Sequence, residues 1–366
     1  MKLVFITQEL GPGHPVLAQT VDLVRGLSSR VDELAVVARD VEWEDIPANV
    51  SMRTFEATGK IRRGLAFERS LAAALPGADA VFVHMVPEFA VLAAPLARVR
   101  RLPILFWYTH WNVSRQLRIA ARLATVVLSV DTSSFPIATP KVRGIGHAID
   151  VERFAAAPPA EHAGPLRLLA FGRTARWKGL ATLLDAVSLA RGEGADVRLE
   201  IRGPSLTDDE QTHRLELERH ILSDPMLQSH AELLAPVARE EMPTLLAASD
   251  IVISPNEPRS GSTLDKAVFE AAACARPVIS TNTSFAPLLG GLPLPLLAAP
   301  RDAAALAAAI ATVAAAASAV RTETGSLLRE RVIARHSLDH WADAVLDVVG
   351  EVRSPRGTAS SARAAG

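Results

Sequence analysis

Short apolar runs rich in β-branched residues alternate with stretches of helical periodicity along most of the chain. This alternation is typical of parallel sheets whose strands are joined by crossover helices. Apolar residues recur at i, i+3, i+4 and i+7 within 179–191, which predicts an amphipathic helix there. The pattern predicts two doubly wound α/β units, with strands at Leu3–Thr7, Leu34–Val37, Ala80–Val83, Ile104–Trp107, Val126–Ser129, Lys141–Ile145, Arg167–Phe171, Val197–Ile201, Ile251–Ser254 and Val278–Ser280.

The length of 366 residues also favours two domains, since single domains usually contain roughly 100 to 200 residues. The stretch 155–165 is rich in Ala and Pro and breaks every periodicity, so we place the boundary there. We expect an N-terminal domain over 1–158 and a C-terminal domain over 164–335. The last residues, 354–366, are mostly Ser, Arg, Gly and Ala without a pattern, and we expect them to be disordered.

Composition narrows the class of protein. A formal net charge of -1 and an aromatic content of 5% leave neither a basic field nor many stacking platforms, so we expect no nucleic-acid partner. The single cysteine, Cys274, excludes an internal disulfide and a multi-cysteine metal cluster. It fits a reducing compartment, and we expect a cytoplasmic protein.

No segment has the pattern of a membrane span. The N-terminal apolar run is too short for a signal peptide, 80–97 contains charged and proline residues, and 303–320 is mostly alanine. Arg98, Arg100 and Arg101 form a short cationic patch that could touch an anionic membrane, but we favour a solvated helix end.

One carboxylate, Glu270, lies in an apolar helical segment that follows a loop of small residues, Gly261, Ser262, Thr263 and Leu264. Backbone N–H groups at a helix start can bind an anion, and a carboxylate in the next two turns can accept hydrogen bonds from hydroxyls. A loop that binds phosphates and a glutamate that binds a ribose would together bind a nucleotide. The alternative is a glutamate that caps its own helix or pairs with a core arginine.

A second cluster follows the strand expected at 167–171, where Gly172 precedes Arg173, Arg176 and Lys178. Cations at a helix start oppose the helix dipole, so they do not serve to stabilise the helix. They are expected to bind an anion and, together with the loop before Glu270, to clamp both phosphates of a nucleotide diphosphate. Solvated surface cations are the alternative.

The N-terminal half offers histidines after expected strands. His110 directly follows a strand, where ligands of open α/β sheets bind, and its ring is expected to point into the cleft. Gly11, Gly13 and His14 lie in the loop after the first strand, where Gly-x-Gly alone is a weak dinucleotide signal. His84 is expected to be structural. No pair of ligands has metal spacing, and we expect no metal cofactor.

Three segments together resemble the family 4 retaining glycosyltransferases of the GT-B fold, over nearly the whole chain. They are Phe171–Gly179 with its Gly-Arg and Lys-Gly pairs, Gly146–Phe154, and Phe269–Ile279. The resemblance implies two Rossmann-like domains that face a cleft. It also implies that a C-terminal helix near 336–352 crosses back to the first domain.

The resemblance implies a role for each matching residue. Arg173 and Lys178 would hold the donor diphosphate and neutralise the leaving group, and Glu270 would bind the ribose hydroxyls. His110 matches the histidine that faces the transferred sugar, and the loop from Gly11 to His14 would lie near acceptor and phosphate.

The chain departs from the family at one position. The family usually has a second glutamate eight residues before the ribose-binding one, and here that position is Ser262. Either Ser262 contacts the donor sugar weakly, or Asp265 or Glu257 substitutes from the same loop. A subset of the family is similar in having Gly-Ser-x-Leu-Asp-Lys here, so we do not take the change as loss of activity.

We therefore expect a sugar to move from a nucleotide diphosphate donor to an acceptor hydroxyl, with retention at the anomeric carbon. The cations and the helix start would act by electrostatic stabilisation of the leaving group. The acceptor could be a small metabolite, a natural product or a glycan. The alternatives are a nucleotide-sugar epimerase and a catalytically silent GT-B scaffold that binds a nucleotide sugar.

Overall fold

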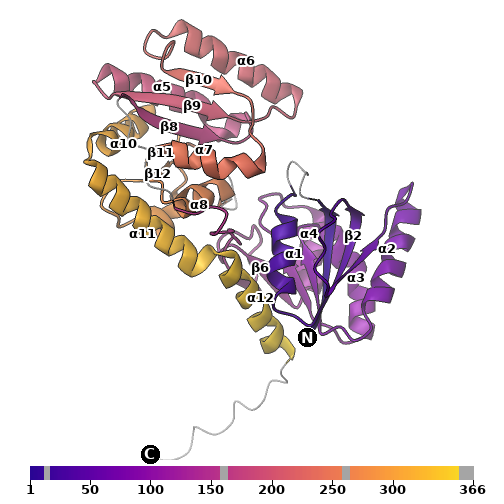
Figure 1. The fold of residues 1–366 in the computed structure, drawn as a ribbon. Coiled ribbons are helices and arrows are strands. Elements are labelled where there is room, and N and C mark those ends of the chain that lie inside the picture. The colour runs from indigo at the N-terminus through magenta and orange to yellow at the C-terminus, as the bar shows by residue number, and fades with distance from the viewer. Residues whose placement is uncertain (12–16, 157–163, 258–263, 354–366) are drawn as a thin grey trace, which may run out of the picture. The chain divides into compact units, whose positions relative to one another are not determined.

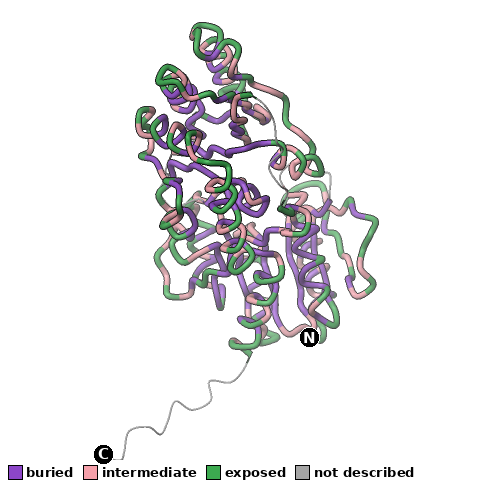
Figure 2. Tube along the Cα trace, turned by 60° about the vertical axis from the view of Figure 1, so that its left-hand side comes forward, coloured by how far each residue is buried: buried purple, intermediate pink, exposed green. Residues whose placement is uncertain are grey.

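The computed structural model describes four stretches of the chain, residues 1–11, 17–156, 164–257 and 264–353. The chain folds into two compact units, unit 1 with Met1–Ala148 and Leu338–Gly366, and unit 2 with Ile149–Ser337 (Figure 1). Each unit contains one parallel sheet, and buried residues are concentrated along the strands (Figure 2). The predicted fold class, two doubly wound α/β units, is confirmed.

The division between the units differs from the predicted one, because it lies before Ile149 and not within 155–165. Ile149 forms a bridge with Ser337 at the end of unit 2. Arg329 donates hydrogen bonds to the carbonyl oxygens of Val151 and Phe154, at 3.2 and 2.8 Å. These contacts attach the segment after Ala148 to unit 2. The stretch 155–165, where the periodicity breaks, therefore lies several residues after the boundary between the units.

Unit 1 is built on a seven-stranded sheet with the strand order β3-β2-β1-β4-β5-β6-β7. Its strands are β1 Lys2–Leu10, β2 Glu33–Val41, β3 Val50–Thr54, β4 Ala80–His84, β5 Ile104–Trp107, β6 Val126–Ser129 and β7 Val142–Gly144. Its helices are α1 Thr20–Ser28, α2 Lys60–Ala74, α3 Pro87–Val99, α4 Arg115–Leu123 and α12 Leu338–Arg353.

Two groups of helices cover the sheet of unit 1. Alternate side chains of its central strands pack against α2, α3 and α4 in one apolar core. On the other face, Trp341 of α12 packs edge-on against Phe82 and Trp107, with ring centroids 5.7 Å apart in both pairs. Arg30 beyond α1 pairs with Asp339 of α12 at 2.7 Å. The last helix is therefore part of the first unit's core.

Unit 2 is built on a five-stranded sheet with the strand order β10-β9-β8-β11-β12. Its strands are β8 Leu166–Phe171, β9 Val197–Arg202, β10 Ala231–Leu234, β11 Ile251–Ser254 and β12 Val278–Ser280. Its helices are η1 Arg176–Lys178, α5 Leu180–Gly192, α6 Asp208–Ser223, η2 Arg239–Glu241, α7 Met242–Ala248, α8 Lys266–Ala273, η3 Thr283–Phe285, α9 Ala286–Leu289, α10 Ala303–Ala315 and α11 Ser318–His336.

All ten predicted strands and the helix predicted over 179–191 are present, within a few residues at their ends. Two strands were not predicted, β3 and β10, and each lies at an edge of its sheet. Strand β3 exposes most of its side chains and carries polar residues, since an edge strand is covered on fewer sides. Strand β10 is mostly apolar, but it is interrupted by Glu232 and has no β-branched residue, so the pattern used to predict strands is missing from it.

Among the described residues, no single helix has the length and apolar character needed to cross a membrane. Helices α10 and α11 meet that criterion only when taken together, and the chain bends by 112° between them. The described residues also contain no group of three or more His, Cys, Asp or Glu side chains placed to hold a metal ion.

Candidate functional site

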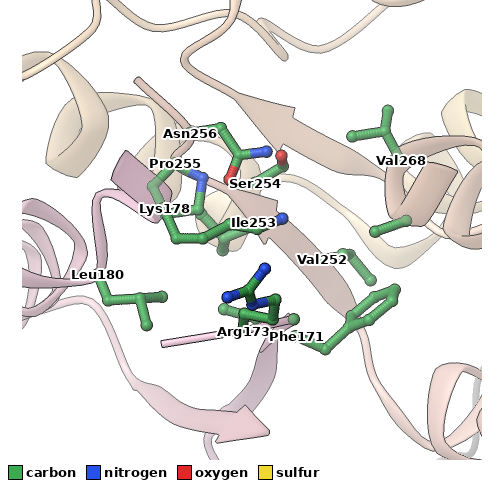
Figure 3. Close-up of a pocket in the computed structure, with 13 residues that line it drawn as sticks. Phe171, Arg173, Lys178, Leu180, Val252, Ile253, Ser254, Pro255, Asn256 and Val268 are labelled. Atoms are coloured by element: carbon green, nitrogen blue, oxygen red, sulfur yellow. The ribbon is translucent and has the colours of Figure 1, made fainter. Parts of the chain in front are cut away.

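In unit 2, several polar side chains lie together at the carboxyl ends of β8 and β11. Neighbouring strands of a parallel sheet end at the same edge, and ligands of such sheets bind there. A pocket at this edge is formed by the two strand ends, η1 and the start of α8 (Figure 3). Its lining includes Phe171, Gly172, Arg173, Lys178, Leu180, Ile253, Ser254, Pro255, Asn256, Ala267 and Val268.

Glycines allow the chain to pack closely at this edge. Gly172 has φ +127°, and a Cβ atom there would lie 3.2 Å from Lys178 Nζ. Gly179 has φ +65°, and a Cβ atom there would lie 2.0 Å from the carbonyl oxygen of Pro255. Only glycine fits such a contact at a positive φ. The two turns therefore bring Lys178 against the end of β11.

Lys178 is nearly buried, and its ammonium group forms an ion pair with the carboxylate of Asp265. Asp265 also accepts hydrogen bonds from Asn256 Nδ2 at 2.8 Å and from the Ala267 N–H at 3.2 Å, so it caps α8. Burial by itself would raise the pKa of Asp265, but the charge of Lys178 and these hydrogen bonds outweigh it and lower that pKa. Asp265 is therefore ionised at neutral pH.

Ser254 ends β11 and lines the same pocket (Figure 3). Its hydroxyl is buried and has no hydrogen-bond partner among the described residues. A buried hydroxyl without a partner costs free energy, so such groups usually meet water or a ligand. The space enclosed by the lining residues is about 10 Å³, which is room for one water. A larger ligand would lie over this edge.

The cation cluster after β8 separates into two groups. Arg173 lines the pocket and pairs with the buried carboxylate of Glu210 on α6, with Arg173 Nη2 and Glu210 Oε1 2.5 Å apart. Arg176 also pairs with carboxylates of α6, Glu216 at 2.7 Å and Asp209 at 3.3 Å. Arg176 is half exposed and does not line the pocket. The structure thus brings Arg173 and Lys178 together and leaves Arg176 outside.

Glu270 is 6% exposed and pairs with Arg239 at 3.2 Å and with Lys266 at 3.7 Å. The pairing with an arginine that the sequence left open as an alternative is present. Cys274, one turn later, is fully buried, and burial raises the pKa of its thiol to about 12, so it packs as an inert side chain. Glu257, considered as a substitute for the missing glutamate, pairs with Arg301 at 2.6 Å.

Unit 1 holds the remaining predicted residues. His110 is exposed after the end of β5, where its Nδ1 accepts a hydrogen bond from the Asn112 N–H at 3.1 Å and its ring stacks on Trp111. Gly11 is buried after β1. His84 is hydrogen-bonded to Thr7 Oγ1 at 3.1 Å, and burial lowers its pKa to about 3. A neutral histidine fixed in this way is structural, as predicted.

Five predicted site residues lie outside the described residues: Gly13, His14, Gly261, Ser262 and Thr263. Leu264 is described and is buried beside the start of α8.

Sequence reasoning missed Ser254, Asn256 and the role of Glu210. Ser254 and Asn256 could have been found, because they stand at the end of a predicted strand, where ligands bind. Glu210 lies on a helix without a marked apolar pattern, 37 residues from Arg173, and no local signal connects the two.

The residues of this site fall within a recognisable family domain. Residues 165–316 match the model of the family described as Glycosyl transferases group 1. No similar chain was found among curated proteins.

Solved structures share the fold across both units. HepE of Anabaena, in complex with UDP and glucose, has a TM-score of 0.75 at 17% identity, covering 96% of this chain and 100% of that one. A glycosyltransferase from Rickettsia africae has a TM-score of 0.76 at 14% identity, covering 96% and 98%. A trehalose-6-phosphate synthase, analysed for glycosyl transfer with retention, has a TM-score of 0.71 at 13% identity, covering 95% and 99%.

At these identities the structural similarity shows only the fold. The family match covers the domain that contains the site. The predicted resemblance is therefore confirmed at the level of family and fold. Residues 165–316 thus match the group 1 glycosyltransferase family, and the two units together have the GT-B fold.

Proposed function

We propose that the protein is a retaining glycosyltransferase that moves a sugar from a nucleoside diphosphate sugar to an acceptor hydroxyl. The observation that carries this proposal is the nearly buried ammonium group of Lys178, held at the carboxyl edge of the unit 2 sheet beside Gly172 and the start of α8. A fixed cation and a helix start at a strand edge suit a diphosphate. HepE, which has the same fold, was crystallised with UDP-glucose.

In this proposal the bond between the anomeric carbon and the donor phosphate oxygen breaks while the acceptor oxygen bonds to that carbon from the same face. The departing phosphate takes the acceptor proton. Negative charge grows on the diphosphate as the bond breaks, so Arg173 and Lys178 lower the barrier by stabilising the leaving group. Because these side chains can supply the positive charge, we propose that transfer needs no metal ion.

The remaining roles follow the resemblance and are proposals. Glu270 accepts hydrogen bonds from the ribose hydroxyls, with Arg239 and Lys266 holding its carboxylate. His110 faces the transferred sugar, and the loop from Gly11 to His14 borders the acceptor. A cytoplasmic location is likewise part of the proposal.

The ion pairs of two carboxylates decide whether either one can replace the glutamate that the family usually has at the position of Ser262. Asp265 and Glu257 are both engaged with cations, Lys178 and Arg301. We therefore assign Asp265 to the positioning of Lys178 and do not assign either carboxylate to the donor sugar.

The test is incubation of the protein with a panel of UDP, GDP and other nucleotide sugars, with release of the nucleotide measured by chromatography. We expect slow donor hydrolysis or nucleotide release with one donor, at a rate that excess EDTA leaves unchanged. A rate that EDTA abolishes and Mg²⁺ or Mn²⁺ restores would show that a metal is required.

A catalytically silent scaffold is the second candidate, and one observation favours it. Each cation of the site already has a carboxylate partner: Arg173 pairs with Glu210, Lys178 with Asp265 and Arg239 with Glu270. A donor must therefore compete for charges that are partly satisfied. Calorimetry that shows donor binding, combined with no nucleotide release from any donor in the panel, would favour the scaffold and count against the transferase.

The pair of Asp265 with Lys178 allows a charge to be removed without removing a helix cap. Asp265→Asn keeps a good capping residue but leaves Lys178 without its carboxylate. We expect kcat/KM to fall roughly tenfold, because the lysine is no longer held in place. Asp265→Ala also loses the cap, which lowers the free energy of unfolding by about a further 1 kcal/mol. Wild-type kcat/KM in the asparagine variant would contradict the positioning role.

The same variant has a pH signature. Because the pKa of Asp265 is lowered by folding, its contribution to stability is present above the usual aspartate pKa of 3.8 and is lost as the pH falls below it. Thermal unfolding of wild type and Asp265→Asn should therefore differ at neutral pH and converge in acid.

A further inference from the structure

Helix α2 carries an exposed patch of cations and apolar side chains in unit 1. Ile61 and Leu65 are 81% and 62% exposed, and their spacing of four residues places them on one face, opposite the buried Phe67. Five exposed cations lie on the same helix and on the neighbouring strand β3: Lys60, Arg62, Arg63 and Arg69 on α2, and Arg53 on β3. We call these seven residues the α2 patch.

The cations of the α2 patch do not stabilise the helix that carries them. Lys60, Arg62 and Arg63 lie in the first turn, where positive charge opposes the helix dipole. That turn contains no acidic residue, and the residue before it, Gly59, offers no side-chain cap. Stability of the helix alone would favour aspartate or serine at these positions.

The cations of the α2 patch are also without ionic partners. Within the described residues, none of the five forms an ion pair, and their only side-chain hydrogen bond is donated by Arg63 Nε to the carbonyl oxygen of Ala57, at 3.4 Å. By contrast, four arginines within the strands pair with carboxylates: Arg39, Arg167, Arg198 and Arg202. Glu56 and Glu68 are the nearby acids in sequence, too few to neutralise the patch.

We infer that the α2 patch docks the protein onto an anionic membrane surface. Cations bind the headgroups, and two large apolar side chains that protrude between them can enter the boundary between headgroups and acyl chains. The charge of the patch is complementary to that surface. Nucleic acid fits less well, because no aromatic side chain of the patch is available for stacking.

The position of the patch is compatible with function at a membrane. Helix α2 covers the edge strands β2 and β3 and connects β3 to β4 in a parallel sheet (Figure 1). Its first residues therefore lie at the carboxyl edge of the strands, the edge at which Gly11 and His110 follow β1 and β5. The inference concerns binding and does not depend on the proposed transferase activity.

The C-terminal end of α3 provides a matched control. Val99 is 84% exposed beside Arg98, Arg100 and Arg101, so this end of α3 has nearly the same chemistry. These arginines lie at a helix C-terminus, where positive charge is favourable, so helix stability accounts for them. They are the solvated helix end that the sequence predicts, and we expect no part for them in membrane binding.

The experiment is sedimentation of the full chain with vesicles, without donor or acceptor, so the result is independent of catalysis. Vesicles of phosphatidylglycerol mixed with phosphatidylcholine should bind the protein, and vesicles of phosphatidylcholine alone should not. The double variant Arg62→Gln with Arg63→Gln should weaken binding about 25-fold, since each cation near such a surface contributes roughly fivefold. The double variant Ile61→Ser with Leu65→Ser should weaken it about tenfold or more.

The control variant, Arg98→Gln with Arg100→Gln, removes the same charge and should bind like wild type. Circular dichroism melts establish that each variant is folded. Absence of wild-type binding to the anionic vesicles would overturn the inference, and so would an equal loss in the control and in the α2 variants. Binding that responds to the charge variant but not to the apolar one would identify a purely ionic surface and overturn the docking of Ile61 and Leu65.

Discussion

Replacement of Lys178 by alanine is expected to lower kcat by about 100-fold or more, the size usually seen when one group that stabilises developing charge is removed. The ammonium group is nearly buried at the edge of the unit 2 sheet, so no mobile surface cation replaces it easily. The variant also leaves the carboxylate of Asp265 without its ionic partner beside the diphosphate site, which adds repulsion.

Nucleotide release from the active donor measures this effect, with kcat and KM determined separately. Arg176→Ala is the matched control, because Arg176 belongs to the same short helix but pairs with Glu216 and Asp209 away from the pocket. It should retain wild-type turnover. The double variant Lys178→Ala with Asp265→Ala should recover part of the affinity for the donor, because it removes the unpaired carboxylate. Unchanged turnover in Lys178→Ala would show that this lysine does not stabilise the leaving group.

Replacement of Gly179 by alanine is expected to destabilise unit 2 by about 2 to 5 kcal/mol and to impair donor binding as well. A side chain at φ +65° is strained, and the new Cβ would lie 2.0 Å from the carbonyl oxygen of Pro255. Strain in a left-handed conformation contributes about 1 to 2 kcal/mol, and the displacement of well-packed neighbours about 1 to 3 kcal/mol. Relief of the clash would move Pro255 and the neighbouring Asn256 away from Lys178.

Chemical denaturation followed by fluorescence and circular dichroism measures the stability, and donor affinity is measured under conditions where the variant is folded. Gly192→Ala is the control at the other end of α5, where a Cβ atom would meet nothing within 4 Å. It should be neutral or slightly stabilising, since alanine favours the helix. Equal stability of the two variants would mean that the contact with Pro255 is not a constraint.

The agreement between sequence and structure is greatest for the central strands. A fully buried strand such as β11 is apolar up to its last residue, and that requirement is visible in three consecutive residues, Ile251 to Ile253. Strand β3 was missed because an edge strand is constrained on fewer sides and its exposed positions accept polar residues. Strand β10 was missed because its four residues include Glu232 and no β-branched residue. The boundary between the units was misplaced because contacts of Arg329 with Val151 and Phe154, distant in sequence, attach that segment to unit 2.

By itself, the sequence determined the class of fold, the strand ends that carry polar residues, and the concentration of cations at Arg173 and Lys178. Each of these depends on periodicity or on neighbours within a few positions, which a chain displays directly. Only the tertiary structure decided which carboxylate each cation meets: Lys178 meets Asp265 across 87 residues, Arg173 meets Glu210 across 37, and Arg176 meets Glu216 outside the pocket. The reason is that ionic partners are selected by the packing of strands and helices far apart in the chain, and their charges alone do not specify which pairs form.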